Sequence, residues 1–144
     1  MLFFEVIDTS SKKLVAIVNE KIEVGVAMNA LAHCSLAIGA KIGENFACLT
    51  QYIDKNEEFN WPLSAMPFII LKGTSGEIKK AVRNAGEGNI QHTAFTDTAT
   101  GGTWEEQILR TKEKTADEFT YYAAVLCGDF EAVKAITKKF SLFR

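Results

Sequence analysis

The hydrophobic positions fall into short runs separated by polar segments. The first clear run, Lys12–Asn19, is rich in β-branched residues. From Leu14 to Val18 it places apolar side chains at successive positions instead of alternate ones. Such a run is typical of a strand covered on both faces, as in the centre of a parallel sheet. We therefore predict a central, parallel-type strand over these residues.

The segment that follows, residues 24–40, is apolar on almost every side and is built largely from Ala, Gly, Met and Leu. This composition predicts a buried helix whose small side chains allow a sheet to approach closely. A buried strand followed by such a helix is the first half of a βαβ unit.

The rest of the chain continues the alternation of strands and helices. The spacing Thr74 to Glu77 is typical of a capping box and predicts a helix that ends at Gly86 and Gly88. A second such spacing, at Thr103, predicts a polar, superficial helix, and Asp129 precedes a last one. Further strands are predicted at residues 48–53, 66–71, 90–97, 119–127 and 140–143. With no repeat or linker, residues 1–144 form a single α/β domain.

Composition changes this picture little. The 144 residues are 47% hydrophobic and 24% charged, with a net charge of −2, which fits a globular domain and not a disordered chain. Proteins that bind nucleic acid usually carry a basic domain or stripe, and neither half of this chain is basic. We therefore do not expect a nucleic acid as partner.

The three cysteines, Cys34, Cys48 and Cys127, are an odd number and form no Cys-x-x-Cys pair. This spacing favours reduced thiols in a cytoplasmic protein, with no metal and no other cofactor. The N-terminal apolar run stops at Glu5 and has no basic flank, so it is not typical of a signal peptide. Residues 24–40 are too short and too polar to predict a membrane span, and no membrane association is expected.

No strong catalytic motif is present, so candidate chemistry rests on where polar residues follow strands. Asn19 follows the first strand, Asp97 ends a later one with Thr98 and Thr100 beside it, and Gly128 follows another. In open α/β sheets, ligands bind beyond the carboxyl ends of strands. If these three strands are parallel, the residues share one edge of the sheet.

Two of the candidate residues have both a chemical and a structural interpretation. Asp97, among threonine hydroxyls, fits a general base that positions a water or a hydroxyl, and equally a turn residue bonded to nearby amides. His33 fits a catalytic imidazole, and equally a hydrogen-bonded histidine of the core.

Several stretches resemble a known fold family. Residues 30–36 are similar to the first-helix motif of type II peptidyl-tRNA hydrolases, and residues 125–142 are similar to the last strand, turn and helix of that fold. Residues 66–71, the Phe95–Asp97 segment and the Phe-Ser-Leu ending resemble a family of uncharacterised proteins, a domain of unknown function, that shares this fold. The resemblance covers about residues 12–144. It implies a three-layer αβα architecture with a mixed four- to five-stranded sheet.

The resemblance carries the hydrolase activity over only in part. The lysine and the glutamine of the hydrolase helix fall on Val26 and Ala30, and Asn29 lies next to the glutamine position. Asp97 matches the hydrolase aspartate at the strand end, whereas the expected threonine falls on Gly101. The resemblance thus adds His33 and Asp97 as candidate catalytic residues. The candidate ligand-binding residues are Asn19, Asn29, Thr98, Thr100 and Gly128.

Three functions are open at this point. The first is a divergent hydrolase-like or small-ligand-binding protein that uses the edge at Asp97, so whether the chain is an enzyme is undecided. The alternative is an active peptidyl-tRNA hydrolase that cleaves the ester of peptidyl-tRNA. The third is an interaction surface for a homodimer, formed by residues 119–130 together with residues 2–7.

Overall fold

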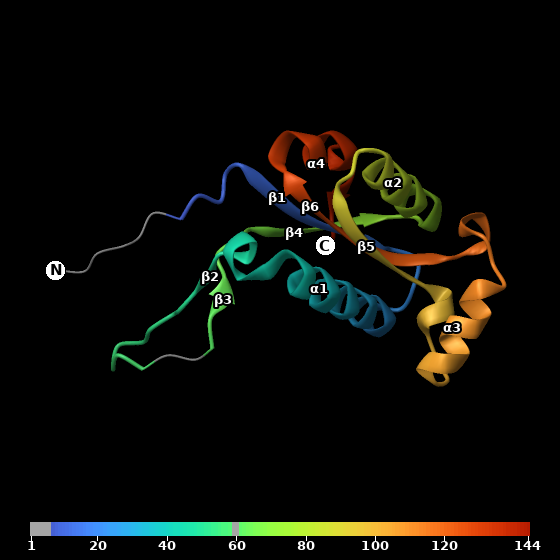
Figure 1. Ribbon diagram of the computed structural model, residues 1–144, viewed down its shortest axis with the longest axis horizontal. Helices are drawn as coiled ribbons and strands as arrows, with labels where there is room; N and C mark the ends of the chain where they lie inside the picture. The colour runs from blue at the N-terminus through green and yellow to red at the C-terminus, as the bar shows by residue number, and fades with distance from the viewer. Residues whose placement is uncertain (1–6, 59–60) are drawn as a thin grey trace.

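A five-stranded mixed sheet carries helices on both of its faces (Figure 1). The computed structural model describes residues 7–58 and 61–144. In sheet order, the strands are β5 (Gln91–Thr96), β6 (Tyr121–Asp129), β1 (Lys12–Asn19), β4 (Phe68–Gly73) and β7 (Ser141–Leu142). The helices of the described chain are α1 (Val24–Ala47), α2 (Ser75–Glu87), α3 (Trp104–Lys112) and α4 (Phe130–Thr137), with short 3-10 turns η1 (Asp97–Ala99) and η2 (Ala116–Glu118).

The central position of β1 is confirmed. It pairs in parallel with β4, where Leu14 lies opposite Phe68, and antiparallel with β6, where Val18 lies opposite Ala123. Only one of its two neighbours is therefore parallel. β5 is antiparallel to β6, and β7 is antiparallel to β4, which makes the sheet mixed, as predicted.

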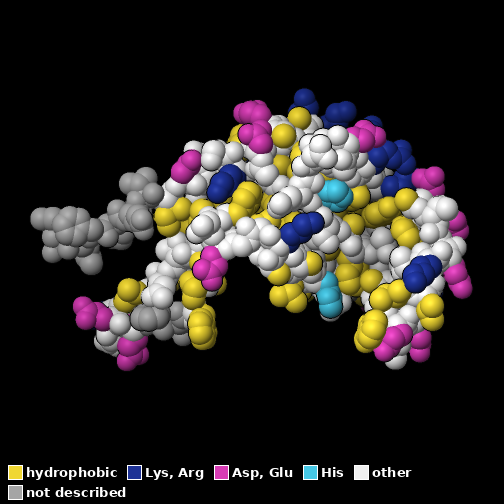
Figure 2. All heavy atoms as spheres, viewed as in Figure 1, with side chains coloured by type: hydrophobic (Ala, Val, Ile, Leu, Met, Phe, Trp, Pro, Cys, Tyr) yellow, Lys and Arg dark blue, Asp and Glu magenta, His cyan; other side chains and the backbone are white. Residues whose placement is uncertain are grey.

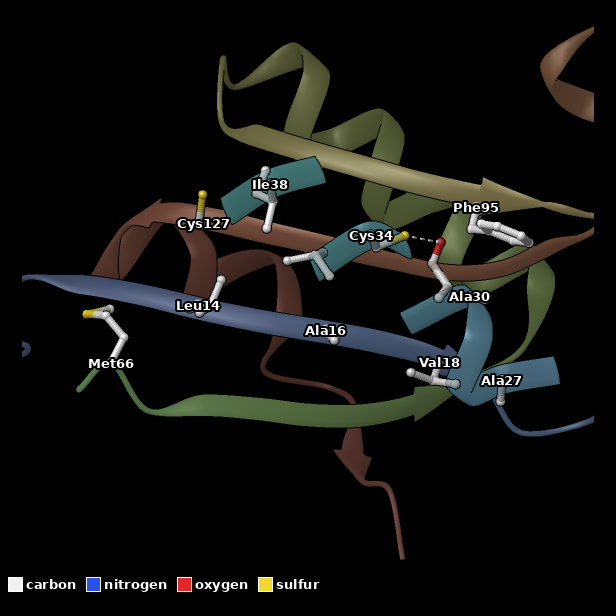
Figure 3. Close-up of a cluster of buried hydrophobic side chains, with 12 residues drawn as sticks. Leu14, Ala16, Val18, Ala27, Ala30, Cys34, Ile38, Met66, Phe95 and Cys127 are labelled. Carbon is white, nitrogen blue, oxygen red and sulfur yellow. Dashed lines mark hydrogen bonds between the residues drawn. The ribbon is translucent and has the colours of Figure 1, made fainter. Parts of the chain in front are cut away.

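The side chains of β1 divide the core into two layers because successive residues of a strand point to opposite faces. On one face, Leu14, Ala16 and Val18 pack against α1, where Cys34 donates a hydrogen bond to the carbonyl of Ala123 at 3.9 Å (Figure 3). On the other face, Val15 and Ile17 belong to the cluster that α2 and α4 cover. The sheet is thus the middle of three layers.

Helix α1 differs from its prediction in burial and in length. Its inner face is buried through Ala27, Ala30, Cys34 and Ile38, but its outer face is open to solvent. The predicted burial therefore holds for the inner face of the helix only. The helix runs to Ala47, with a break at Gly43, whose φ of 78° favours glycine. At 24 residues, α1 is long and apolar enough to cross a membrane by length and composition, a test that core helices also pass.

The predicted strand at residues 48–53 does not join the main sheet. Within this range, Leu49–Thr50 form the strand β2, which pairs with Leu63–Ser64 (β3) in a separate two-stranded sheet. We call residues 49–58 and 61–64 the arm, because these residues project away from the layers in Figure 1. The charged run that begins at Asp54 interrupts the apolar pattern, so the segment offers no continuous face to the core.

The predicted helix caps are present. In α2, the Thr74 side chain accepts a hydrogen bond from the Glu77 amide, and Glu77 accepts one from the Thr74 amide, which completes the capping box. In α3, Thr103 accepts from the Glu106 amide, and no residue of this helix is buried, so its superficial position is confirmed. The strand predicted at residues 66–71 is β4, which begins at Phe68 because Pro67 has no N–H to donate.

A pair of glycine substitutions tests the packing at the end of β4. A methyl group at Gly73 would lie 2.9 Å from the Phe140 ring and 3.2 Å from Ile17, both in the same packed cluster. We expect Gly73→Ala to lower the free energy of unfolding by about 1–3 kcal/mol, measured by urea titration. Gly76→Ala is the control, since nothing lies within 4 Å of the added carbon and alanine favours a helix. Equal stabilities for the two variants would contradict this packing.

Candidate functional site

The direction of β6 decides which of the predicted residues meet. The carboxyl ends of β1 and β5 lie at the same edge of the sheet, because both strands are antiparallel to β6 between them. Asn19 and Asp97 therefore do share an edge. Gly128 lies at the opposite one, where it pairs with Lys13 at the start of β1. The condition that all three strands run parallel is not met, and Gly128 is separated from the other candidates.

Asn19 is a buried part of the sheet. Its Nδ2 donates to the Tyr121 carbonyl at 2.9 Å, and its Oδ1 accepts from the Lys21 amide at 2.8 Å. The side chain is only 3% exposed. Both ends of the amide are therefore engaged, one in joining the end of β1 to the start of β6 and the other in the turn that follows β1.

Asp97 occupies the turn after β5. Its Oδ1 accepts a hydrogen bond from the Thr120 amide at 3.0 Å, and its Oδ2 forms an ion pair with the Lys114 ammonium at 3.3 Å. The Asp97 amide in turn donates to the Thr120 carbonyl at 2.9 Å. These contacts correspond to the turn-residue interpretation, because the carboxylate holds the entry to β6 in place.

Thr98 ties the same turn to α3 through a chain of hydroxyls. Its Oγ1 lies 2.8 Å from Thr96 Oγ1 and accepts a hydrogen bond from Thr111 at 2.8 Å. Thr98 is 3% exposed, so it lies beneath the surface. Like Asn19, it supports the edge and does not face solvent.

Arg110 of α3 fixes the loop at residues 98–101, and the sequence prediction missed it. Its Nε donates to the Thr98 carbonyl at 2.8 Å, and its Nη2 donates to the carbonyls of Thr100 and Gly101. A guanidinium has five donors in a rigid fork, which suits it to hold several carbonyls at once. The available signal was the spacing of Gln107, Arg110 and Thr111, which places them on one side of a helix.

His33, Asn29 and Thr100 come together at one hollow of about 430 Å³. His33 and Asn29 lie four residues apart in α1 and so project from the same side of the helix. Across from them, the hollow is lined by Thr100 and Gly101 of the loop and by Gln107 of α3. We call this space the α1–α3 hollow. Asp97 and Thr98 are not among its lining residues.

His33 is exposed, in contrast to the interpretation of a core histidine. Its ring lies 5.5 Å from that of Phe95, at an interplanar angle of 38°, a tilted aromatic contact that orients the imidazole. The lining residues of the α1–α3 hollow include no aspartate, glutamate, lysine or arginine. The hollow therefore offers hydrogen-bonding groups and one titratable imidazole instead of fixed charge.

The described residues hold no cluster of metal-ligating side chains, and two of the three thiols are buried. No group of three or more histidine, cysteine or acidic side chains is placed to hold a metal ion among residues 7–58 and 61–144. Burial raises the pKa of Cys34 to about 12 and that of Cys127 to about 11. Both thiols are therefore protonated near neutral pH, which suppresses nucleophilic attack.

A second and larger hollow, of about 500 Å³, lies between α2 and α4. It is lined by Lys80, Asn84, Glu87 and Lys139 together with apolar side chains such as Ile136. None of the predicted site residues reaches it. We place the candidate site at the α1–α3 hollow, where three of them converge.

The order and packing of these elements make this a three-layer α/β protein, with a mixed five-stranded sheet and four helices in the described chain. The model of a family of proteins of unknown function, DUF2000, matches residues 12–144, and the chain belongs to this family. Among solved structures, the chain is similar to a protein of unknown function from Agrobacterium tumefaciens strain C58, with a TM-score of 0.80 and 21% identity. The match covers 93% of this chain and 98% of that one, and at this identity it shows the fold alone. No curated protein matches the sequence.

The contacts of Asp97 predict a structural effect when it is replaced. We expect Asp97→Ala to lower the free energy of unfolding by about 1–3 kcal/mol, because the Thr120 amide loses its acceptor. Asp97→Asn keeps an acceptor and should cost less. Lys114→Ala removes only a partly exposed ion pair and should change stability by less than about 1 kcal/mol. Urea unfolding of the three variants checks this order, and a wild-type stability for Asp97→Ala would contradict the assignment.

The thiols give a second prediction. Of the three cysteines, Cys48 is only partly buried, so at pH 8 one equivalent should react rapidly with a disulfide reagent and two only after denaturation. Cys34 and Cys127 ionise near 9 in the unfolded chain, so their burial contributes stability below pH 9 that is lost as the pH rises toward 11. Three thiols that react at one rate in the folded protein would show that the two buried ones are accessible.

Proposed function

We propose that this protein binds a small polar ligand in the α1–α3 hollow. One observation carries the proposal: hydrogen-bonding side chains from two separate elements line the same space. Asn29 and His33 come from α1, and Gln107 comes from α3. Small-molecule sites commonly combine a concave surface with a few convergent polar groups of this kind.

The chemistry of the lining groups favours a ligand with a carbonyl or carboxylate group. The carboxamides of Asn29 and Gln107 both donate and accept hydrogen bonds, and the His33 imidazole does either according to its protonation. Gly25 and Val26, in the first turn of α1, also line the space. The first amides of a helix have no partner within the helix and favour a negatively polarised group.

The wall opposite α1 is preorganised. Arg110 holds the carbonyls of residues 98, 100 and 101, and Gln107 Nε2 donates to the Gly101 carbonyl at 3.3 Å, which orients its carboxamide. A site with fixed walls loses less conformational entropy when it binds a ligand. This arrangement supports binding without a large closing movement.

The likeness to type II peptidyl-tRNA hydrolases supports the location of this site more than it supports the reaction. Val26, which stands where those hydrolases have their lysine, lines the hollow, so the cation that would contact a tRNA phosphate is missing there. Ala30, at the glutamine position, is buried in the core. The Asp97 carboxylate contacts Thr120 and Lys114 outside the hollow, which favours a binding protein over a hydrolase.

Binding is tested with N-acetylglycine, a simple probe that has an amide and a carboxylate. In ¹H–¹⁵N spectra of the labelled protein, N-acetylglycine should cause saturable shifts at residues of the α1–α3 hollow. His33→Ala and Asn29→Ala should each weaken this binding at least about tenfold, the loss expected when one or two good hydrogen bonds are removed. His92→Ala is the matched control, since His92 lies on β5 beside the Ile90 carbonyl and outside the hollow.

The opposing results are distinct. Shifts that do not saturate, or that persist unchanged in both hollow variants, would overturn the proposed binding site. Hydrolysis of diacetyl-lysyl-tRNA at low salt, abolished by Asp97→Asn in a folded variant, would instead establish a divergent peptidyl-tRNA hydrolase.

A further inference from the structure

The outer face of α1 has a composition unlike that of a solvent-exposed helix. Residues 24–40 contain no charged side chain, although one long side of the helix faces outward. Val24, Met28 and Leu36 are 66%, 65% and 74% exposed and lie at multiples of four residues, so they form one apolar row. Surface helices normally carry charged residues on their outer side, and a helix that is apolar all round is normally buried.

The arm presents a second apolar surface. Trp61 is 92% exposed, and the other large apolar side chains of the arm are also turned outward: Leu49, Tyr52, Ile53 and Leu63. The arm is held to the body at its base, where Ala65 donates to the Cys48 carbonyl at 2.9 Å. Its ladder is two residues long on each strand, and a two-stranded hairpin of this kind is marginal without further packing.

From these two surfaces we infer that the protein forms a twofold symmetric dimer in which the arm of each chain packs on the outer face of α1 of the other. The three residues of the apolar row are different from those of α1 that line the α1–α3 hollow. Figure 2 shows the apolar side chains gathered along the side of the molecule formed by the arm, α1 and α3, with a concave space between the arm and the body.

Symmetry explains why the partner is a second copy. Each chain carries both an arm and an open helix face, and a twofold axis brings the arm of one chain to the helix of the other twice. The arm follows directly after the C-terminal end of α1. If the two α1 helices run antiparallel about the twofold axis, each arm lies along the apolar row from Val24 to Leu36 of the other helix.

The lengths and areas agree with this arrangement. An extended limb from Leu49 to Asp54 reaches up to about 20 Å, and the apolar face from residue 24 to residue 40 is about 26 Å long. With roughly 150–250 Å² for each large side chain, the arm and the α1 row together expose on the order of 1,000 Å². A stable interface needs about 800 Å² from each partner.

The charges distinguish this partner from a lipid surface. Beside the apolar side chains of the arm, Asp54, Glu57 and Glu58 outnumber Lys55. Helices that lie in a membrane interface usually carry lysine and arginine on their polar side, and α1 has no cation before Lys41. An anionic membrane would repel the arm, whereas a second copy of this chain does not require a cationic surface.

The experiment measures mass by sedimentation equilibrium between about 1 and 200 μM, on the full chain. We expect a dimer for the wild type, with a dissociation constant raised at least tenfold by Leu36→Glu on α1 and also by Trp61→Ser on the arm. Leu142→Glu on β7 is the matched control, because it places the same charge at another exposed leucine, 47% exposed, and should leave the dimer intact. Circular dichroism verifies that each variant is folded.

Mixing the two interface variants tests the exchange of arms directly. The Leu36→Glu chain has an intact arm, and the Trp61→Ser chain has an intact helix face, so a mixed dimer retains one complete contact. We expect the mixture to associate more tightly than either variant alone. A monomeric wild type at 200 μM, a dimer that is insensitive to Trp61→Ser, or a mixture no tighter than its parts would overturn the inference. Flotation of the wild type with phosphatidylcholine–phosphatidylserine vesicles, together with a monomeric mass, would assign the surface to a membrane instead.

Discussion

The antiparallel ladder between β1 and β6 is the interaction on which the other features of this structure depend. Seven residue pairs, from Lys12 with Asp129 to Val18 with Ala123, set the register of the two most buried strands. Because β6 also pairs with β5, its direction brings the ends of β1 and β5 to one edge. A one-residue slip would turn the apolar side chains of β6 to the wrong faces, so the register is strongly specified. The turns that hold the candidate site are built on this edge.

Local sequence signals predicted the parts of the fold that depend on neighbouring residues. The run from Leu14 to Val18 indicated a central strand, and the Thr74–Glu77 spacing indicated the start of α2, because both reflect chemistry within a few positions. Strand direction is a different kind of property. Nothing within residues 119–127 distinguishes a parallel from an antiparallel central strand, since both are apolar when covered on two faces. The position of Gly128 was therefore not predictable from its own surroundings.

The predicted dimer surface illustrates the same limit. Residues 119–130 were apolar enough to suggest an interface, but most of them form β6, whose residues Ala123 to Cys127 are buried inside the sheet. The other half of that prediction, residues 2–6, lies outside the described residues, and Ile7 is exposed. Conversely, α1 looked buried on all sides because its uncharged composition is that of a covered helix. An uncharged composition is typical of a covered helix face, but it does not identify what would cover that face.

Some of the predicted polar site residues stabilise the turns of the protein, whereas others line a hollow. Asn19, Asp97 and Thr98 engage the backbone and hydroxyls around them, whereas Asn29 and His33 stand on a helix whose main-chain bonds are already satisfied. Polar residues at strand ends meet unpaired amides and carbonyls, which readily take up their hydrogen bonds. In the middle of a helix a hydroxyl can still donate to the carbonyl four residues earlier, as Ser35 does to Leu31, whereas Asn29 and His33 line the α1–α3 hollow.

The arm lies at a place in the chain where a change in length does not disturb the sheet. The arm interrupts the crossover from β1 through α1 to β4, while the pairing of β1 with β4 is fixed by residues 14–19 and 68–73. Insertions or deletions between residues 50 and 62 therefore leave the sheet register unchanged, because loop length has only a weak effect on chain-closure entropy. The segment can therefore diverge in length and sequence while the three layers beneath it stay the same.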